Sequence, residues 1–179
     1  AYYEKTHAND SHIMWDTSLQ EANDAYQEDF PSMPQFQYNY TANTPEGWNL
    51  HSIHGTKVVI LDLNTNVELV LQNTKNLFFE SHPFHLHGYN FYVVGVGIGT
   101  YNPEKDPSSF NLVDPPAMNT VGIPSGGWVA LRFYTDNPGV WLMHCHFEMH
   151  TSWGMMMVWI VKDGQNVKLP PPPKDYPKC

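Results

Sequence analysis

Residues 141–157 read WLMHCHFEMHTSWGMMM, and this stretch sets the fold and the chemistry of the chain. Its first half belongs to VWLMHCHF (140–147), which is apolar and aromatic like a core strand, yet carries His144, Cys145 and His146 in succession. Side chains on a β-strand alternate between its two faces, so both histidines point one way and the cysteine points the other. The strand is therefore expected to serve two different sites.

A second cluster, HPFHLHG (82–88), lies earlier in the chain and brings three more histidines: His82, His85 and His87. Together the two clusters hold six of the ten histidines, which a random scatter would rarely produce. If the two strands are neighbours, alternation gives one histidine-only group, namely His85, His87, His144 and His146. Cys145 is then left with His82 and His150 for a second site.

One thiolate and two imidazoles with a weak thioether form the ligand set of a blue-copper electron-transfer site. Met155 follows Cys145 by ten residues and is the candidate thioether. Zinc also accepts one cysteine and two histidines, but a structural zinc site gives no reason for a separate histidine-only group. We therefore expect copper. Four imidazoles cannot fill the coordination of two or three copper ions, so either that group is exposed or a second domain supplies the remaining ligands.

The rest of the chain reads as an all-β domain. Alternating or apolar runs predict strands at 57–63, 67–74, 128–135, 140–147 and 154–164 and a β-rich stretch at 82–97. A long loop is predicted at 101–127 and a short helix near 148–153. Many short strands separated by turns favour an antiparallel sandwich or barrel. Residues 1–50 are polar and proline-punctuated, so we expect an N-terminal arm or connecting segment there and the copper-binding domain at 51–179.

Composition excludes several functions. The chain has 9 Lys and Arg against 18 Asp and Glu, a net charge of -9, which disfavours a nucleic-acid partner. No apolar run approaches the roughly 20 residues that span a bilayer, so no membrane partner is expected. The opening AYYEKTHAND is polar and lacks an initial Met, so we expect no signal peptide within it and a processed product or fragment. Sequons at Asn9 and Asn39 would permit glycosylation.

HPFHLHGYNF and WLMHCHFEMHTSWGM resemble the two copper-binding signatures in the C-terminal cupredoxin domain of multicopper oxidases, and of plant laccases in particular. GIGTYNPEKDPSSFNLVDPP, NTVGIPSGGW, DNPGVW and LPPPPKDYPKC are also similar to laccase sequences, and the resemblance covers roughly residues 29–179. It implies an all-β, cupredoxin-like Greek-key β-sandwich or barrel with a long N-terminal arm. It also implies a secreted, apoplastic glycoprotein connected with lignin.

The resemblance further implies a role for each ligand. The type 1 copper would have a complete set: His82, Cys145, His150 and axial Met155. The type 2 and type 3 ions would be partly liganded, by His85 and by His87, His144 and His146 respectively. Phenolic substrates would give electrons near the edge of His150, and O₂ would be reduced to water at the trinuclear cluster. Glu148 would orient a ligand or relay protons, or be a carboxylate without such a role.

The same resemblance implies a partner, because the family's other trinuclear ligands come from an N-terminal cupredoxin domain. Cys179 would pair with that domain. Three other functions stay open at this point. An ascorbate-oxidase-type enzyme shares the same ligands, a single-domain blue-copper electron carrier needs only the type 1 set, and a zinc-stabilised binding module needs only the Cys and two His.

Overall fold

The computed structural model describes residues 2–4, 39–41, 58–75, 80–164, 170–171 and 173–175, with backbone alone at 2–4. Most of the predicted N-terminal arm lies outside these residues, as do the boundary expected between residues 50 and 51, the sequon at Asn9, and Cys179. None of the described helices is long and apolar enough to cross a membrane.

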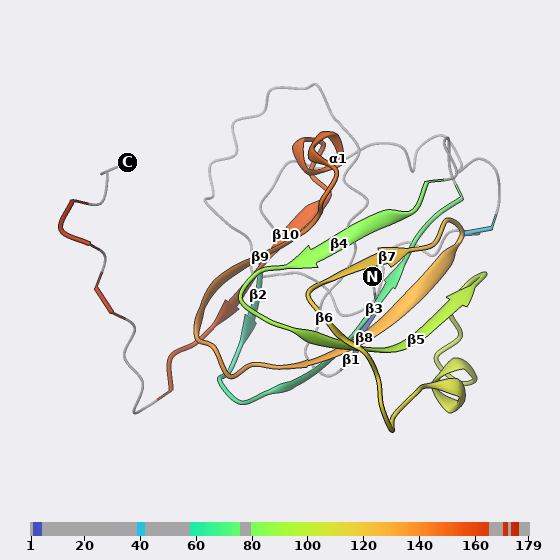
Figure 1. Cartoon of the computed structure of the whole chain (residues 1–179), viewed down its shortest axis with the longest axis horizontal. Coiled ribbons are helices and arrows are strands. Elements are labelled where there is room, and N and C mark those ends of the chain that lie inside the picture. Colours follow the sequence, from blue (N-terminus) through green and yellow to red (C-terminus); the bar gives the residue numbers. More distant parts are fainter. Residues whose placement is uncertain are drawn as a thin grey trace.

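The described residues form two five-stranded sheets (Figure 1). The first has the order β1 (Tyr2–Glu4), β3 (Asn66–Gln72), β8 (Gly127–Tyr134), β5 (Phe91–Ile98) and β6 (Ala117–Met118). The second has the order β2 (Val58–Leu61), β10 (Met156–Val161), β9 (Gly139–Cys145), β4 (His82–Leu86) and β7 (Thr120–Ile123). The helices among the described residues are the short η2 (Asp106–Ser109) and α1 (Glu148–Ser152). The all-β, cupredoxin-like sandwich expected from the sequence is confirmed.

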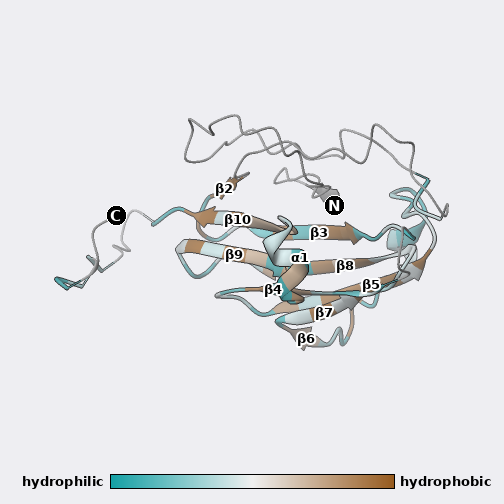
Figure 2. Ribbon diagram, turned by 90° about the horizontal axis from the view of Figure 1, so that it is seen from above, coloured by the Kyte–Doolittle hydropathy of each residue, from teal (hydrophilic) through white to brown (hydrophobic). Residues whose placement is uncertain are grey.

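The core lies between the sheets and takes apolar side chains from both. Leu69 and Val129 of the first sheet and Met143 and Trp159 of the second are each fully buried in one continuous cluster. Burying a side chain of this size is worth about 1.5–3 kcal/mol, so this cluster is the main source of stability. Hydrophobic residues accordingly recur along the strands, β3, β8 and β10 among them, while many described loop residues are hydrophilic (Figure 2).

The strand predictions are confirmed at β2, β3, β8, β9 and β10, and the short helix at α1. The predicted loop at 101–127 is wrong in part, because it contains η2, β6 and β7. Strand β7 pairs with β4, and its apolar residues Val121 and Ile123 point into the core while Gly122 is exposed. Its four residues lie among prolines, glycines and asparagines, whose turn preference concealed the alternation.

One pairing departs from the expected antiparallel arrangement, because β2 pairs with β10 in parallel, Val59 opposite Trp159. Strands β2 and β3 flank a turn as predicted, but they do not pair, and the turn carries the chain from one sheet to the other. Thr135 supports this turn, since its hydroxyl accepts from the amide of Thr65 and donates to the carbonyl of Asp62.

Candidate metal centre

The two histidine clusters of the sequence lie on neighbouring strands. Strands β4 and β9 pair antiparallel, with Phe84 opposite Cys145 and His85 opposite His144, so the assumed adjacency is confirmed. On the core side of this pair are Phe84, Leu86, Met143 and Cys145, all buried. The neighbouring histidines of both strands lie on the other side. Alternation therefore separates the thiol from the histidines that flank it.

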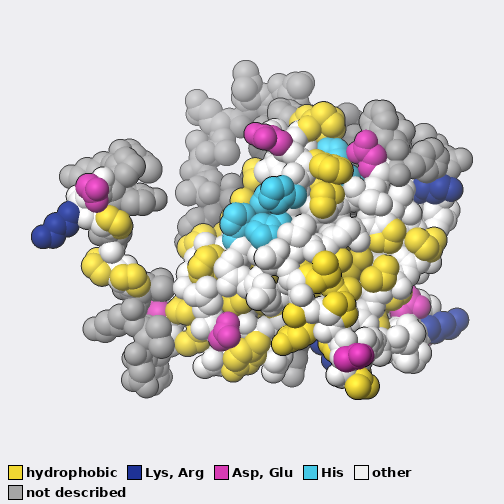
Figure 3. All heavy atoms as spheres, viewed as in Figure 1, with side chains coloured by type: hydrophobic (Ala, Val, Ile, Leu, Met, Phe, Trp, Pro, Cys, Tyr) yellow, Lys and Arg dark blue, Asp and Glu magenta, His cyan; other side chains and the backbone are white. Residues whose placement is uncertain are grey.

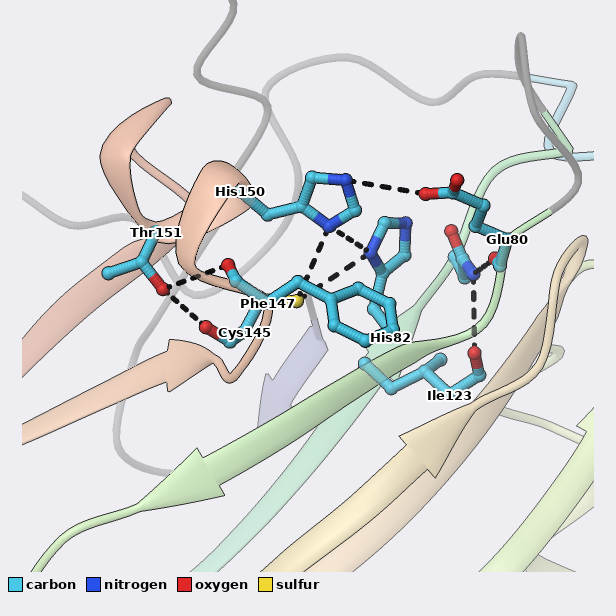
Figure 4. Close-up of polar contacts among 8 residues, drawn as sticks. Glu80, His82, Ile123, Cys145, Phe147, His150 and Thr151 are labelled. Atoms are coloured by element: carbon cyan, nitrogen blue, oxygen red, sulfur yellow. Dashed lines mark hydrogen bonds and ion pairs between the residues drawn. The ribbon is translucent and has the colours of Figure 1, made fainter.

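The thiol of Cys145 lies beside two imidazoles (Figure 4). Its Sγ is 3.8 Å from Nδ1 of His82 and 3.5 Å from Nδ1 of His150, and these two nitrogens are 3.1 Å apart. His82 comes from the start of β4 and His150 from α1, so three elements converge here. One ligand atom from each residue lies within 4.8 Å of the others. We call this group of three residues the thiol site.

The electrostatics of the thiol site favour a bound cation. Burial raises the pKa of the Cys145 thiol, a hydrogen bond with the Phe147 backbone lowers it, and the negative charge of Glu80 raises it again. Burial and Glu80 thus disfavour the thiolate, which is the form that binds metal, and a nearby cation would stabilise it. A soft thiolate with two imidazoles fits copper well. The donor set present therefore suits the group expected from the sequence.

Backbone hydrogen bonds hold Met155 next to this site. Its carbonyl accepts from the Cys145 amide at 2.9 Å, and its own amide donates to the His150 carbonyl at 2.9 Å. Its partly buried side chain packs against the main core cluster. The chain thus fixes Met155 relative to two members of the thiol site, while its role as axial ligand stays a prediction.

Four histidines gather on the opposite side of the β4–β9 pair: His85, His87, His144 and His146. Histidine side chains form a patch on the surface in Figure 3. We call these four residues the histidine cluster. Its ring centroids are 4.7 Å apart for His85 and His87, and 5.4 Å apart for His144 and His146. The Nε2 atoms of His87 and His144 face each other at 3.1 Å. His87 and His146 are exposed, so ligands from another domain or another chain can approach them.

Hydrogen bonds to carbonyls fix which ring nitrogen is free in two of these histidines. Nδ1 of His144 lies 2.9 Å from the Cys145 carbonyl, and Nδ1 of His85 lies 2.8 Å from the Asn119 carbonyl. A carbonyl can only accept, so each Nδ1 carries the proton and each Nε2 keeps its lone pair. Both Nε2 atoms are then available to a metal ion, an arrangement typical of metal-binding histidines.

The neighbours of His87 disfavour its protonated form. Its pKa is lowered by partial desolvation of the ring and then by the positive charge that His85, His144 and His146 would carry when protonated. Neutral imidazole is the metal-binding form, so crowding four rings together keeps a ligand ready for a cation.

The two groups are joined by the backbone of residues 144–146, a bonded path that needs no further residue. The Cys145 carbonyl lies at the middle of this path and accepts hydrogen bonds from Nδ1 of His144 and from the hydroxyl of Thr151. A shift of this carbonyl would therefore change the hydrogen bonds of both His144 and Thr151.

Sequence reasoning missed several residues that contact these groups: Glu80, Asn119, Thr120 and Thr151. Glu80 Oε2 lies 3.3 Å from Nε2 of His150, and the Thr120 hydroxyl lies 2.8 Å from Nδ1 of His85. Isolated polar residues near a motif give no periodic signal, so only the fold could place them. The sequence instead singled out Glu148, which is an exposed residue in the first turn of α1, and its role stays a prediction.

A comparison with protein families supports this chemistry. The family model described as "Multicopper oxidase" matches residues 28–165. Among curated proteins, Laccase-11 from Arabidopsis thaliana and Laccase-4 from Oryza sativa subsp. japonica are each 56% identical over 156 residues. Those alignments cover 86% of this chain but only 28% and 27% of the two laccases. The chain thus spans less than a third of these relatives.

Solved structures agree with the fold. A laccase from Botrytis aclada matches with a TM-score of 0.53 and 37% identity, over 63% of this chain and 21% of the laccase chain. Fet3p, a multicopper oxidase that functions in iron import, matches with a TM-score of 0.52 and 31% identity, over 58% of this chain and 21% of its own.

Proposed function

Because the chain belongs to the multicopper oxidase family, we propose that it is the C-terminal copper-binding domain of a laccase-type enzyme that oxidises phenolic compounds and reduces O₂ to water. The observation that supports this most is the pairing of β4 with β9, which puts a thiol with two imidazoles on one face and four imidazoles on the other. An electron carrier or a structural zinc site would need only the first group. The curated relatives are laccases, which favours this function over an ascorbate-oxidase-type one.

In this proposal the thiol site is the type 1 copper site, held by His82, Cys145 and His150 with Met155 at the axial position. Bound copper supplies one-electron chemistry by alternating between its two oxidation states. Cys145 is completely buried, so the protein keeps water away from the thiolate. Nε2 of His150 faces Glu80, and the Phe147 and Trp153 rings lie beside the imidazole.

The histidine cluster would hold part of a trinuclear copper site. His85 would bind the type 2 ion, and the type 3 pair would be bound by His87, His144 and His146. Four imidazoles are too few for three ions, so an N-terminal cupredoxin domain would supply the remaining ligands. The exposure of His87 and His146 supports this arrangement, because a second body can reach them.

Two exposed aromatic residues would receive the phenolic substrate. The Phe147 and Trp153 rings lie 5.4 and 5.7 Å from that of His150, and the two residues are 47% and 42% exposed. An aromatic donor could pack against these rings, as aromatic pairs do at such distances. Secretion to the apoplast, lignin precursors as donors, a glycan at exposed Asn39 and a disulfide from Cys179 to the N-terminal domain complete the proposal.

Replacing each of the two cysteines by serine, one at a time, tests the proposal. Copper-loaded chain should show the intense blue thiolate-to-copper absorption and the matching paramagnetic resonance spectrum. Cys145→Ser should abolish both, since a serine hydroxyl does not replace a thiolate. Cys179→Ser is the matched control and should keep both. Blue absorption that survives in Cys145→Ser, or a chain that binds zinc but no copper, would refute the proposed function.

A further inference from the structure

The two ring nitrogens of His150 face different partners. Nδ1 points to the thiol site, 3.5 Å from Sγ of Cys145, while Nε2 lies 3.3 Å from Oε2 of Glu80. Figure 4 shows Glu80 reaching the imidazole on the side away from the sulfur. His150 is only 5% exposed, so its ring has little freedom to turn and exchange these partners.

The contact with Glu80 decides the form of the imidazole. An ionised carboxylate only accepts hydrogen bonds, so Nε2 of His150 must carry the proton. In the neutral ring Nδ1 then has a lone pair, which points toward the sulfur and toward Nδ1 of His82, 3.1 Å away. Histidines that bind metals generally donate their second N–H to a carboxylate or carbonyl in this way.

The position of Glu80 is itself built into the fold. The amide side chain of Asn73 donates to the Glu80 carbonyl at 2.9 Å and to the Ile123 carbonyl at 3.3 Å. Asn73 is 6% exposed, and its backbone amide donates to the Gly127 carbonyl at 2.8 Å. A buried amide with these partners ties the backbone of Glu80 to β7 and β8. The carboxylate therefore reaches His150 from a fixed point, although its own side chain is 42% exposed.

We propose that Glu80 is the positioning residue for His150. Its carboxylate holds the ring with Nδ1 facing the thiol and places one negative charge at the outer edge of the site. Negative charge there stabilises the more positive ion, so the more oxidised state of a bound metal is favoured. The orientation of the ring follows from this chain alone, whereas the assignment of copper as the metal rests on the proposed function.

Two substitutions separate the two effects. Glu80→Gln keeps an oxygen that can accept from Nε2 but removes the charge, while Glu80→Leu removes both. Glu104→Gln is the matched control, because it removes the same charge from an exposed residue in the loop after β5. Far-ultraviolet circular dichroism and chemical unfolding establish that each variant folds.

The first measurement needs no metal. Nitrogen-15 NMR of the metal-free chain at about pH 8, above the ordinary histidine pKa of about 6.5, reports which nitrogen of His150 is protonated. We expect the Nε2–H form in the wild type, in Glu80→Gln and in Glu104→Gln, and a mixture in Glu80→Leu. The proposal would be overturned if the wild type carried the proton on Nδ1, or if Glu80→Leu showed the same tautomer as the wild type. Either result counts whether or not the chain binds copper.

The second measurement uses copper. Glu80→Leu should weaken copper binding by roughly 10–100-fold, the usual loss when such a partner is removed. Glu80→Gln should keep the blue absorption but raise the reduction potential, by about 59 mV for each tenfold change in relative affinity for the two oxidation states. Equal affinities and potentials in both variants and in Glu104→Gln would refute the assignment of Glu80. Absence of blue absorption in the wild type would instead refute the proposed function and leave the NMR result standing.

Discussion

The three residues 144–146, at the end of β9 and just beyond it, differ in burial although they are adjacent in sequence. Cys145 is completely buried, whereas His146 is exposed and His144 faces His87 across the strand pair. This contrast follows from the two-residue period of a strand, and a slip of one residue would exchange the two sets. The register of β9 against β4 and β10 is therefore what keeps the thiol apart from the histidine cluster.

Met155 gives a prediction at the residue scale. A weak thioether at the axial position tunes the potential of a thiolate-copper site. Met155→Leu should remove this ligand and raise the reduction potential, by about 59 mV for each tenfold change in the relative affinity for the two oxidation states. Cyclic voltammetry of the copper-loaded variant and wild type measures the difference.

Met156→Leu is a suitable comparison for this experiment, because Met156 is adjacent, 41% exposed and on the first position of β10. It should leave the potential unchanged. Equal potentials for Met155→Leu and wild type would count against the axial assignment.

At the scale of elements, the turn between β4 and β5 carries His87 of the histidine cluster and depends on one glycine. Gly88 follows His87 in this turn with φ +75, a left-handed conformation that L side chains rarely adopt. A Cβ there would overlap the ring of Trp141, whose indole N–H donates to the Asn137 carbonyl. The turn therefore depends both on backbone freedom and on space beside β9.

Gly88→Ala should destabilise the chain by about 2–5 kcal/mol, the sum of left-handed strain and overpacking. Gly99→Ala isolates the first contribution, because Gly99 also has a positive φ, +97, but has nothing within 4 Å of the added Cβ. It should cost only about 1–2 kcal/mol. Urea unfolding of both variants measures the difference, and equal losses would show that contact with Trp141 contributes nothing.

The same scale shows which parts of the site were predictable. The alternation of His144, Cys145 and His146 requires only the period of a strand, so the two groups could be separated before their positions were known. The pairing of β4 with β7 could not be predicted this way, because β7 is a four-residue strand within a segment rich in turn residues. The contact of Glu80 with His150 could not be predicted from the sequence either, because it depends on Asn73 and on a carbonyl of β7.

For the whole molecule, the histidine cluster determines what the chain can do alone. In the proposed function its four imidazoles are too few for a cluster of three copper ions, and the chain spans less than a third of the length of its relatives. Copper-loaded chain should therefore accept electrons from a phenolic donor, seen as bleaching of the blue absorption, yet consume little oxygen. An oxygen electrode and stopped-flow absorption measure the two processes on one sample.

Sedimentation analysis of the same sample provides the control, because two copies of the chain could complete a cluster between them. Rapid oxygen consumption by a monomeric chain would contradict the prediction. Rapid consumption by an oligomer would show that a second copy supplies the remaining ligands.

The place of β10 in its sheet bears on the order of events during synthesis. Strand β10 is made after the other nine described strands, yet it lies between β2 and β9 and pairs with both. Until residues 156–161 have left the ribosome, β2 lacks the strand with which it pairs in this sheet, and β9 can pair only with β4. A nascent chain that ends before β10 therefore has an incomplete second sheet, although the three residues of the thiol site have already been made.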